Sequence, residues 1–274
     1  MKSVQDALDL RFGDAPRVQP AEQGAETWRN LANRGVVRRF KPEAVPPEML
    51  DTLCALALSA PSKSDLQQRD ILIVEDPAKR ARIDELLVDQ DWIPKAPHFL
   101  IFLGNNRRQR QVHAWRGHPF ANDHLDAFFN AAVDAGIALS TFVTAAEAAG
   151  LGCCPVSVIR NHASEVSRLL GLPDHVFPVA GLGVGWPAIS ANISARLPLA
   201  ATVHRDTYTD CTRETVAAYD ARRNGIFPYR AQRNIARFGQ SADYGWSEEK
   251  ARHYAEPERA DWGAFIKGKG FKLE

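Results

Sequence analysis

A long apolar segment constrains this chain more than any other feature. Residues 125–149 read LDAFFNAAVDAGIALSTFVTAAEAA, and the sequence Gly150-Leu151-Gly152 follows as a stop signal. A helix here is apolar nearly all the way round, so most of its sides must be covered. In a chain of 274 residues, a subunit interface is a natural cover. We therefore expect this helix to lie at the interface of a homodimer.

The overall charge excludes some partners. The chain has 34 Lys plus Arg against 33 Asp plus Glu, which argues against binding nucleic acid through a basic surface. No run approaches the ~20 apolar residues of a membrane span, and the N-terminus lacks the apolar core of a signal peptide. We therefore expect a cytoplasmic protein with neither a membrane nor a nucleic-acid partner. The four cysteines contain no CxxC pair and are expected to be buried, inert thiols: Cys54, Cys153, Cys154 and Cys211.

The order of the expected elements indicates an α/β or α+β architecture in one unit. The first two elements are both helices, which does not fit a simple βαβ series. Residues 105–123 are expected to form a long loop, residues 1–24 a loose arm broken by Gly13, Pro16 and Pro20, and residues 225–274 a polar, aromatic tail. The expected helices cover residues 26–39, 47–60, 77–88, 125–149, 161–171 and 213–223, and the expected strands cover 69–74, 98–104, 153–159 and 176–185.

Two patterns do not match the sites they first suggest. The run Gly181-Leu-Gly183-Val-Gly185 follows a strand, but Trp186-Pro187 stands where a dinucleotide-binding loop would open into a helix. We interpret the run as a strand whose glycines allow another backbone or a ligand to approach closely. Three histidines of the expected loop, His113, His118 and His124, match no compact metal-ligand spacing, so we predict no metal site.

Three arginines suggest an anion site. Arg34 and Arg38 are four residues apart, so on a helix both would project from one face and reach one anion. Arg196, in the stretch NISARLP, is a candidate third side of a clamp on a phosphate monoester. Each charge-assisted contact of this kind contributes about 1.5–3 kcal/mol.

The motifs that surround these arginines resemble one protein family. RGVVRRFKPEAVPPEMLDTLCALALSAPSKSDLQ is followed in order by AAEAAGLG, LLGLPDHVFPVAGLGVGWP and ARLPL. Together they resemble the FMN-dependent nitroreductase family, particularly its NADPH-dependent nitroreductases and flavin reductases, over residues 26–224. The resemblance implies an α+β fold with a mixed, mainly antiparallel sheet flanked by helices. It also implies an intertwined homodimer in which a domain of residues 25–224 binds FMN and the extension of residues 225–274 wraps the partner subunit.

The resemblance also assigns residues to FMN. The early arginines and Arg196 match the phosphate contacts, and the turn that begins at Ser62 matches the contacts to the ribityl chain and ring. Gln90 matches a glutamine at the pyrimidine end, and the backbone N–H groups of Ser157 and Val158 match those that reach N5 and O4. The full expected set is Arg34, Gly35, Val36, Arg38, Ser62, Lys63, Ser64, Gln67, Gln90, Pro155, Val156, Ser157, Val158 and Arg196.

This chain departs from the family pattern at several of these places. Val36 replaces a serine, Asp65 stands where asparagine is common, and Ser157-Val158 replaces a pattern that contains glycine. Ser194 replaces a lysine shortly before the last arginine. The resemblance therefore implies a weaker hold on the phosphate and a flavin pocket of different shape.

The implied reaction is hydride transfer from NADPH or NADH through flavin N5 to an electron-poor small molecule such as a nitroaromatic, a quinone or a flavin. The flavin carries this chemistry, so no catalytic side chain is expected. Arg222 and Arg223 are candidates for the 2′-phosphate of NADPH, and Trp92, Trp115 and Phe120 for stacking on a flat acceptor or for packing. The alternatives are a reductive dehalogenase or specialised reductase on the same scaffold, and a flavin-binding dimer without activity.

Overall fold

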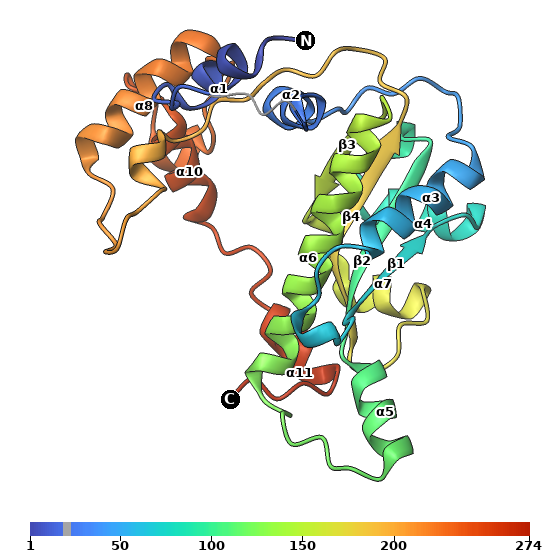
Figure 1. Cartoon of the computed structure of the whole chain (residues 1–274). Coiled ribbons are helices and arrows are strands. Elements are labelled where there is room, and N and C mark those ends of the chain that lie inside the picture. The colour runs from blue at the N-terminus through green and yellow to red at the C-terminus, as the bar shows by residue number, and fades with distance from the viewer. Residues whose placement is uncertain (19–22) are drawn as a thin grey trace. The chain divides into compact units, whose positions relative to one another are not determined.

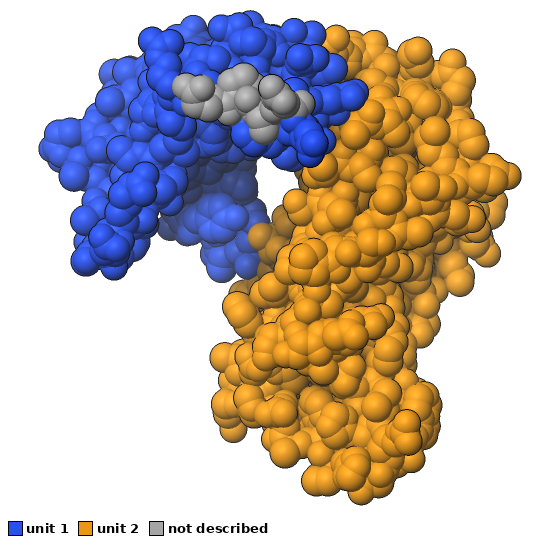
Figure 2. Space-filling model, viewed as in Figure 1, with its two compact units in different colours: residues 1–35, 192–258 blue, residues 36–191, 259–274 orange. Residues whose placement is uncertain are grey.

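The computed structural model describes residues 1–18 and 23–274, and they form two compact units (Figure 2). Unit 1 contains the described residues of Met1–Gly35 and Asn192–Glu258, and unit 2 contains Val36–Ala191 and Arg259–Glu274. The described residues form two compact units instead of the one unit expected from the order of the elements. The expected domain boundaries at residues 24 and 224 stay predictions. Residues 19–22 of the expected arm, including Pro20, lie outside the described residues.

Unit 2 is built on a four-stranded sheet in the order β1-β2-β4-β3 (Figure 1). All of its described pairings are antiparallel, so the α+β class is confirmed while the expected mixed sheet is here wholly antiparallel. The four expected strands are confirmed, although the third ends earlier, at Val156. Their bounds are Arg69–Ile73 (β1), His98–Asn105 (β2), Gly152–Val156 (β3) and Val176–Gly185 (β4).

Both faces of this sheet are covered, as the apolar run of β2 requires. Leu100 and Phe102 belong to a core cluster with residues of α3 and α6, while Phe99, Ile101 and Leu103 belong to a second cluster with residues of α4 and α7. Successive β2 side chains thus enter opposite cores. The four helices span Pro47–Leu58 (α3), Pro77–Leu86 (α4), Leu125–Ala148 (α6) and Ala163–Leu169 (α7).

The long helix α6 is covered mainly by its own chain. Phe142 is fully buried and packs edge-on against Phe102, with ring centroids 5.8 Å apart. Leu125, Phe129 and Val133, spaced four residues apart, leave one exposed apolar stripe. By length and composition α6 could cross a membrane, so the expectation that no run approaches such a span is wrong. Its packing against the sheet and α3 accounts for its apolar composition.

The glycines of β4 make room for side chains. A Cβ on Gly181 would lie 2.5 Å from the Phe99 ring, and one on Gly183 would lie 2.7 Å from Trp92. The strand interpretation of this run is confirmed. The groups that approach it are core side chains of the same unit, so these glycines serve packing.

Helix α5 (Arg107–Arg116) replaces the loop expected at residues 105–123. Its sequence RRQRQVHAWR has no apolar period, and the helix is held by polar contacts. Arg108 pairs with Asp70 of β1 at 2.5 Å, and Arg110 pairs with Asp123 at 2.5 Å. The end of the expected tail also folds within unit 2, where α11 (Trp262–Gly268) packs against α7 and Phe271 is buried.

Unit 1 is helical and corrects two further expectations. Helix α1 occupies 9 residues of the expected loose arm, begins after the N-cap Ser3 and ends at Gly13, whose φ of 81° suits glycine. Helix α2 ends at Asn33 instead of residue 39, so Arg34 and Arg38 do not lie on one helical face. The helices are α1 (Val4–Phe12), α2 (Ala25–Asn33), α8 (Arg213–Ile226), α9 (Ile235–Phe238) and α10 (Trp246–Tyr254), the last two within the expected tail.

The four cysteines differ in their exposure to solvent. Cys153 and Cys154 are buried on β3, as expected. Cys54 is half-buried, and burial raises the pKa of its thiol to about 11, which keeps it protonated and unreactive. Cys211 is exposed, so the expectation of a buried thiol is wrong there.

Replacing Phe142 tests whether α6 is a core helix. Phe142→Ala should lower the free energy of unfolding by about 3–5 kcal/mol, because it leaves a cavity beside Phe102. Urea denaturation measures this loss. Val88→Ala, at a site 72% exposed, is the control and should change stability by at most about 0.5 kcal/mol. Equal losses in the two variants would contradict the core position of Phe142.

Candidate functional site

A basic pocket of about 850 Å³ lies within unit 1. Five cationic side chains line it, and none of the described residues that line it carries a carboxylate. Aromatic, aliphatic and hydroxyl side chains, including Tyr229, Trp246 and Thr202, form the rest of the wall. This composition suits an anionic ligand with a flat or apolar part. The five cations are Arg11, Arg34, Arg196, Arg223 and Lys250.

The pocket brings together two of the three arginines assigned to the phosphate. Arg34 follows the end of α2, and Arg196 lies in the irregular segment before α8. The Arg196 guanidinium donates to Ser194 Oγ at 2.6 Å, so the serine that replaces the family's lysine orients an arginine. Arg38 is exposed and belongs to unit 2. Of the three arginines assigned to the phosphate, unit 1 therefore holds Arg34 and Arg196 in one pocket.

The two adjacent arginines of α8 have different surroundings. Arg222 donates to the carbonyl oxygens of Leu10, Arg11 and Arg196 at 3.0, 3.2 and 2.6 Å, so its guanidinium supports the backbone. Arg223 lines the pocket with its guanidinium 4.1 Å from the centre of the Tyr229 ring. Only Arg223 of this pair is placed to meet a pocket ligand.

Tyr219 closes the wall of the pocket. Burial raises the pKa of its hydroxyl, and the neighbouring arginines partly oppose that effect. The hydroxyl therefore stays protonated near neutral pH and donates to the Ala195 carbonyl at 3.2 Å. This bond ties the backbone just before Arg196 to α8.

In unit 2, the polar turn that begins at Ser62 is organised by a carboxylate of α6. Asp134 is fully buried, accepts from Ser62 Oγ at 2.7 Å, and accepts from the backbone N–H groups of Lys63 and Gln68 at 3.1 Å each. Arg69 lies 3.5 Å away as its ion-pair partner. The sequence signal for Asp134 is its position as a charged residue near the middle of an apolar helix, and the family resemblance does not include it.

The backbone of this turn is strained. Ser64, Asp65 and Gln67 have φ of 49°, 55° and 51°, a region that costs a residue with a side chain about 1 kcal/mol or more. Helix α5 holds the turn through Arg108, which donates to the Gln67 carbonyl at 2.6 Å, and Gln109, which donates to the Leu66 carbonyl at 2.7 Å. Lys63, Ser64 and Gln67 remain exposed.

The aromatic candidates do not form one surface. Trp92 is 6% exposed and packs in the core, and its indole N–H donates to Gln90 Oε1 at 3.2 Å, so it is a packing residue here. Phe120 packs against the Arg110 guanidinium and the His113 ring. Trp115, on α5, is 75% exposed and is the one of the three whose ring is open to a ligand.

The remaining assigned residues lie at or just after the end of β3, and at residues 35 and 36, where the sequence passes from unit 1 to unit 2. Pro155 is exposed and Val156 half-buried at the end of β3; Ser157 is exposed and precedes a short 3-10 helix, Val158–His162. Gly35 is buried, and the Val36 side chain is 40% exposed. Within the part of the chain that the structure describes, no group of three or more His, Cys, Asp or Glu side chains is arranged to hold a metal.

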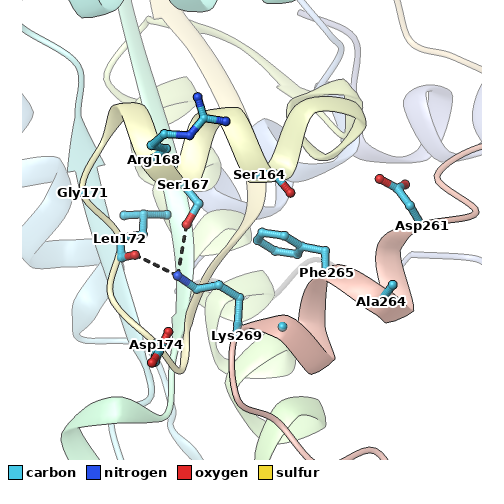
Figure 3. A pocket seen from close by; sticks show the side chains of 11 residues that line it. Ser164, Ser167, Arg168, Gly171, Leu172, Asp174, Asp261, Ala264, Phe265 and Lys269 are labelled. Carbon is cyan, nitrogen blue, oxygen red and sulfur yellow. Dashed lines mark hydrogen bonds between the residues drawn. The ribbon is translucent and has the colours of Figure 1, made fainter.

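Residues of α7 and α11 line a hollow of about 760 Å³, and one of the lining residues, Lys269, joins the two helices (Figure 3). The buried Lys269 ammonium donates to Ser167 Oγ at 3.1 Å and to the Leu172 carbonyl at 2.8 Å. Burial lowers the pKa of Lys269, while Asp174 opposes that shift. A cation beside the C-terminal end of α7 interacts favourably with the helix carbonyls. Lys269 therefore fastens α11 to α7.

Asp134→Asn tests the anchor of the polar turn. An amide oxygen cannot replace the three contacts of the carboxylate, and the change leaves Arg69 buried without its ion pair. We expect a loss of about 3–5 kcal/mol in the free energy of unfolding and faster amide hydrogen exchange across residues 63–68. Asp65→Asn, an exposed change in the same turn, is the control. Unchanged exchange in Asp134→Asn would show that the turn does not depend on this carboxylate.

This chain is similar in sequence to known proteins. The chain matches the model of the Nitroreductase family over residues 31–186 and that of the Nitroreductase family, C-terminal domain, over residues 194–274. It is 32% identical over 254 residues to FMN reductase [NAD(P)H] of Bacillus subtilis (strain 168), covering 91% of this chain and 99% of that protein. It is also 32% identical over 191 residues to the oxygen-insensitive NADPH nitroreductase of Salmonella typhimurium, covering 69% of this chain and 78% of that protein.

Solved structures agree with the sequence matches. NfrA2 of B. megaterium superposes with a TM-score of 0.82 at 34% identity, covering 91% of this chain and 99% of that chain. The NADPH:FMN oxidoreductase from Vibrio harveyi complexed with NAD+ superposes with a TM-score of 0.78 at 25% identity, covering 89% and 98%. The family model over residues 31–186 covers more than half of the chain, so the chain belongs to the nitroreductase family and is an oxidoreductase, as its motifs implied.

Proposed function

We propose that this protein is an FMN-dependent oxidoreductase that passes hydride from NAD(P)H to an electron-poor small molecule such as a nitroaromatic, a quinone or a flavin. The observation that carries the proposal is the pocket of unit 1, in which Arg34 and Arg196 share a wall with three further cations. The similar proteins named as FMN reductase and as NADPH nitroreductase support the same reaction class.

The described residues fit FMN. A phosphate monoester carries up to two negative charges near neutral pH, and a wall with five cations suits such a group. On the proposal, Arg34 and Arg196 hold the phosphate. Bound FMN supplies the hydride chemistry, so the protein's part is to bind, orient and stabilise charge.

The surroundings of the α8 arginines refine the nicotinamide assignment. Arg222 is occupied by three backbone carbonyls, whereas Arg223 faces the pocket. We therefore propose Arg223, and no longer Arg222, as the contact for the 2′-phosphate of NADPH. Trp115 is the proposed aromatic contact for a flat acceptor, and the cytoplasm the proposed location.

Flavin analysis and anaerobic mixing test the proposal. The purified protein should be yellow and should release FMN on acid treatment, because the pocket suits a terminal phosphate. Addition of NADPH without oxygen should bleach the flavin absorbance, and addition of a nitroaromatic should restore it. NADH is the matched donor control. Release of FAD, or no flavin after reconstitution with FMN, would refute the cofactor, and an unbleached flavin would favour a binding protein without activity.

We further propose that the exposed stripe of α6 forms a homodimer interface. Leu125, Phe129 and Val133 are 49%, 59% and 40% exposed and lie along one side of the helix. An apolar stripe of this kind on a monomer would remain in water, and a two-fold contact between two copies would bury it.

Light scattering tests the dimer. The FMN-loaded protein should have a mass of about twice 30.3 kDa at micromolar concentration. Phe129→Asp places a charge in the proposed interface and should shift the mass toward that of the monomer. Val88→Asp, at a more exposed apolar position of unit 2, should leave the mass unchanged. A wild-type monomer that retains FMN would contradict the proposal.

A further inference from the structure

Helix α1 lies outside both matched family models, which begin at residues 31 and 194. Its last turn carries Arg11, a charged residue that is only 7% exposed and that lines the basic pocket. A buried guanidinium must be held by several acceptors, because its charge is costly to remove from water. The acceptors of Arg11 therefore show what α1 is attached to.

Those acceptors belong to the two segments that carry the proposed phosphate arginines. Arg11 Nη2 donates to the carbonyl oxygen of Arg34 at 2.6 Å and to that of Ala32 at 3.1 Å. Arg11 Nη1 donates to the carbonyl oxygen of Ser194, two residues before Arg196, at 3.4 Å. One side chain thus connects the backbone at Arg34 with the backbone next to Arg196, two segments about 160 residues apart in sequence.

The backbone around Arg11 makes further bonds to the same segment. The Arg196 N–H donates to the Arg11 carbonyl at 2.7 Å. Asp14 accepts from the backbone N–H groups of Leu199 and Ala200 at 2.6 and 2.9 Å. The end of α1 therefore fixes the chain on both sides of Arg196.

Gly13 leaves room for the Arg222 side chain of α8. Its φ of 81° ends α1, and a Cβ there would lie 3.0 Å from the Arg222 side chain. Arg222 passes Gly13 and donates to the carbonyls of Arg11 and Arg196. The carbonyl of Arg11 thus accepts from both Arg196 and Arg222.

We propose that α1 braces the phosphate-binding pocket and that Arg11 is a positioning residue for Arg34 and Arg196. This inference rests on the proposed function. Guanidinium groups gathered around one pocket repel one another, and a ligand that had to gather them would lose binding free energy in doing so. A backbone fixed in advance removes that loss, so the brace increases the part of the affinity that depends on the phosphate.

Comparison of FMN with riboflavin isolates that part, because riboflavin lacks the phosphate. The dissociation constants of both ligands are measured on the apo-protein by quenching of flavin fluorescence. In the wild type, FMN should bind more tightly than riboflavin. Arg11→Ala should weaken FMN binding about tenfold or more, the equivalent of one lost charge-assisted contact, and leave riboflavin binding unchanged.

Three further variants serve as comparisons for this measurement. Arg17→Ala removes an exposed arginine of the same N-terminal segment and should bind both ligands like the wild type. Arg196→Ala removes a proposed phosphate contact and should lose FMN affinity with riboflavin binding unchanged, whereas Arg230→Ala, an exposed change in the same unit, should not. If Arg11→Ala does not fold by circular dichroism, Arg11→Lys takes its place, since one ammonium cannot reach the same three carbonyl oxygens.

The outcomes distinguish the positioning role of Arg11 from the proposed phosphate site. An unchanged ratio of FMN to riboflavin affinity in Arg11→Ala, or in Arg11→Lys where it replaces it, would overturn the brace, and so would an equal loss for both ligands. A wild type that binds riboflavin as tightly as FMN would overturn the proposed phosphate site. A selective loss of FMN affinity in the Arg11 variant supports the brace.

Discussion

Cations that converge on one pocket repel one another, and unit 1 is organised around holding them together. The five cations of its pocket come from α1, from the end of α2, from the segment before α8, and from α8 and α10. None of the described residues that line the pocket carries a carboxylate. Backbone carbonyls hold two guanidinium groups of unit 1, because Arg11 and Arg222 each donate to three of them. A carbonyl oxygen orients a guanidinium without neutralising its charge.

Unit 2 uses the opposite arrangement for its polar turn. Asp134 is a buried anion whose partners are the backbone and side chain of the turn, together with Arg69. The carboxylate draws several donors inward, which supports the unfavourable backbone at Ser64 and Asp65. In both units, one buried charged side chain fixes a segment whose exposed groups are available to a ligand.

The parts of the fold that depend on apolar burial could be predicted from the sequence. The strands and helices α3, α4 and α6 have apolar residues at the required spacing, and the structure confirms them. Helices α1 and α5 could not be predicted in this way, because polar contacts through Arg11 and Arg108 hold them. The helical placement of Arg34 and Arg38 was wrong for a related reason. Helix α2 ends at Asn33, and Arg11 donates hydrogen bonds to the carbonyls of Ala32 and Arg34 on either side of that residue.

The site residues show the same limit, because a motif gives a position in the chain but not a direction in space. Arg222 and Arg223 are neighbours, yet about 100° separates successive side chains on a helix, so one supports the backbone and the other faces the pocket. The loss of the family's lysine at Ser194 illustrates the converse. Its replacement orients Arg196, and Arg11 and Lys250 bring positive charge to the same pocket from elements that the motif does not include. The charge of a phosphate site can thus persist while the residues that supply it change, so a departure within a motif is interpreted correctly only with the whole pocket in view.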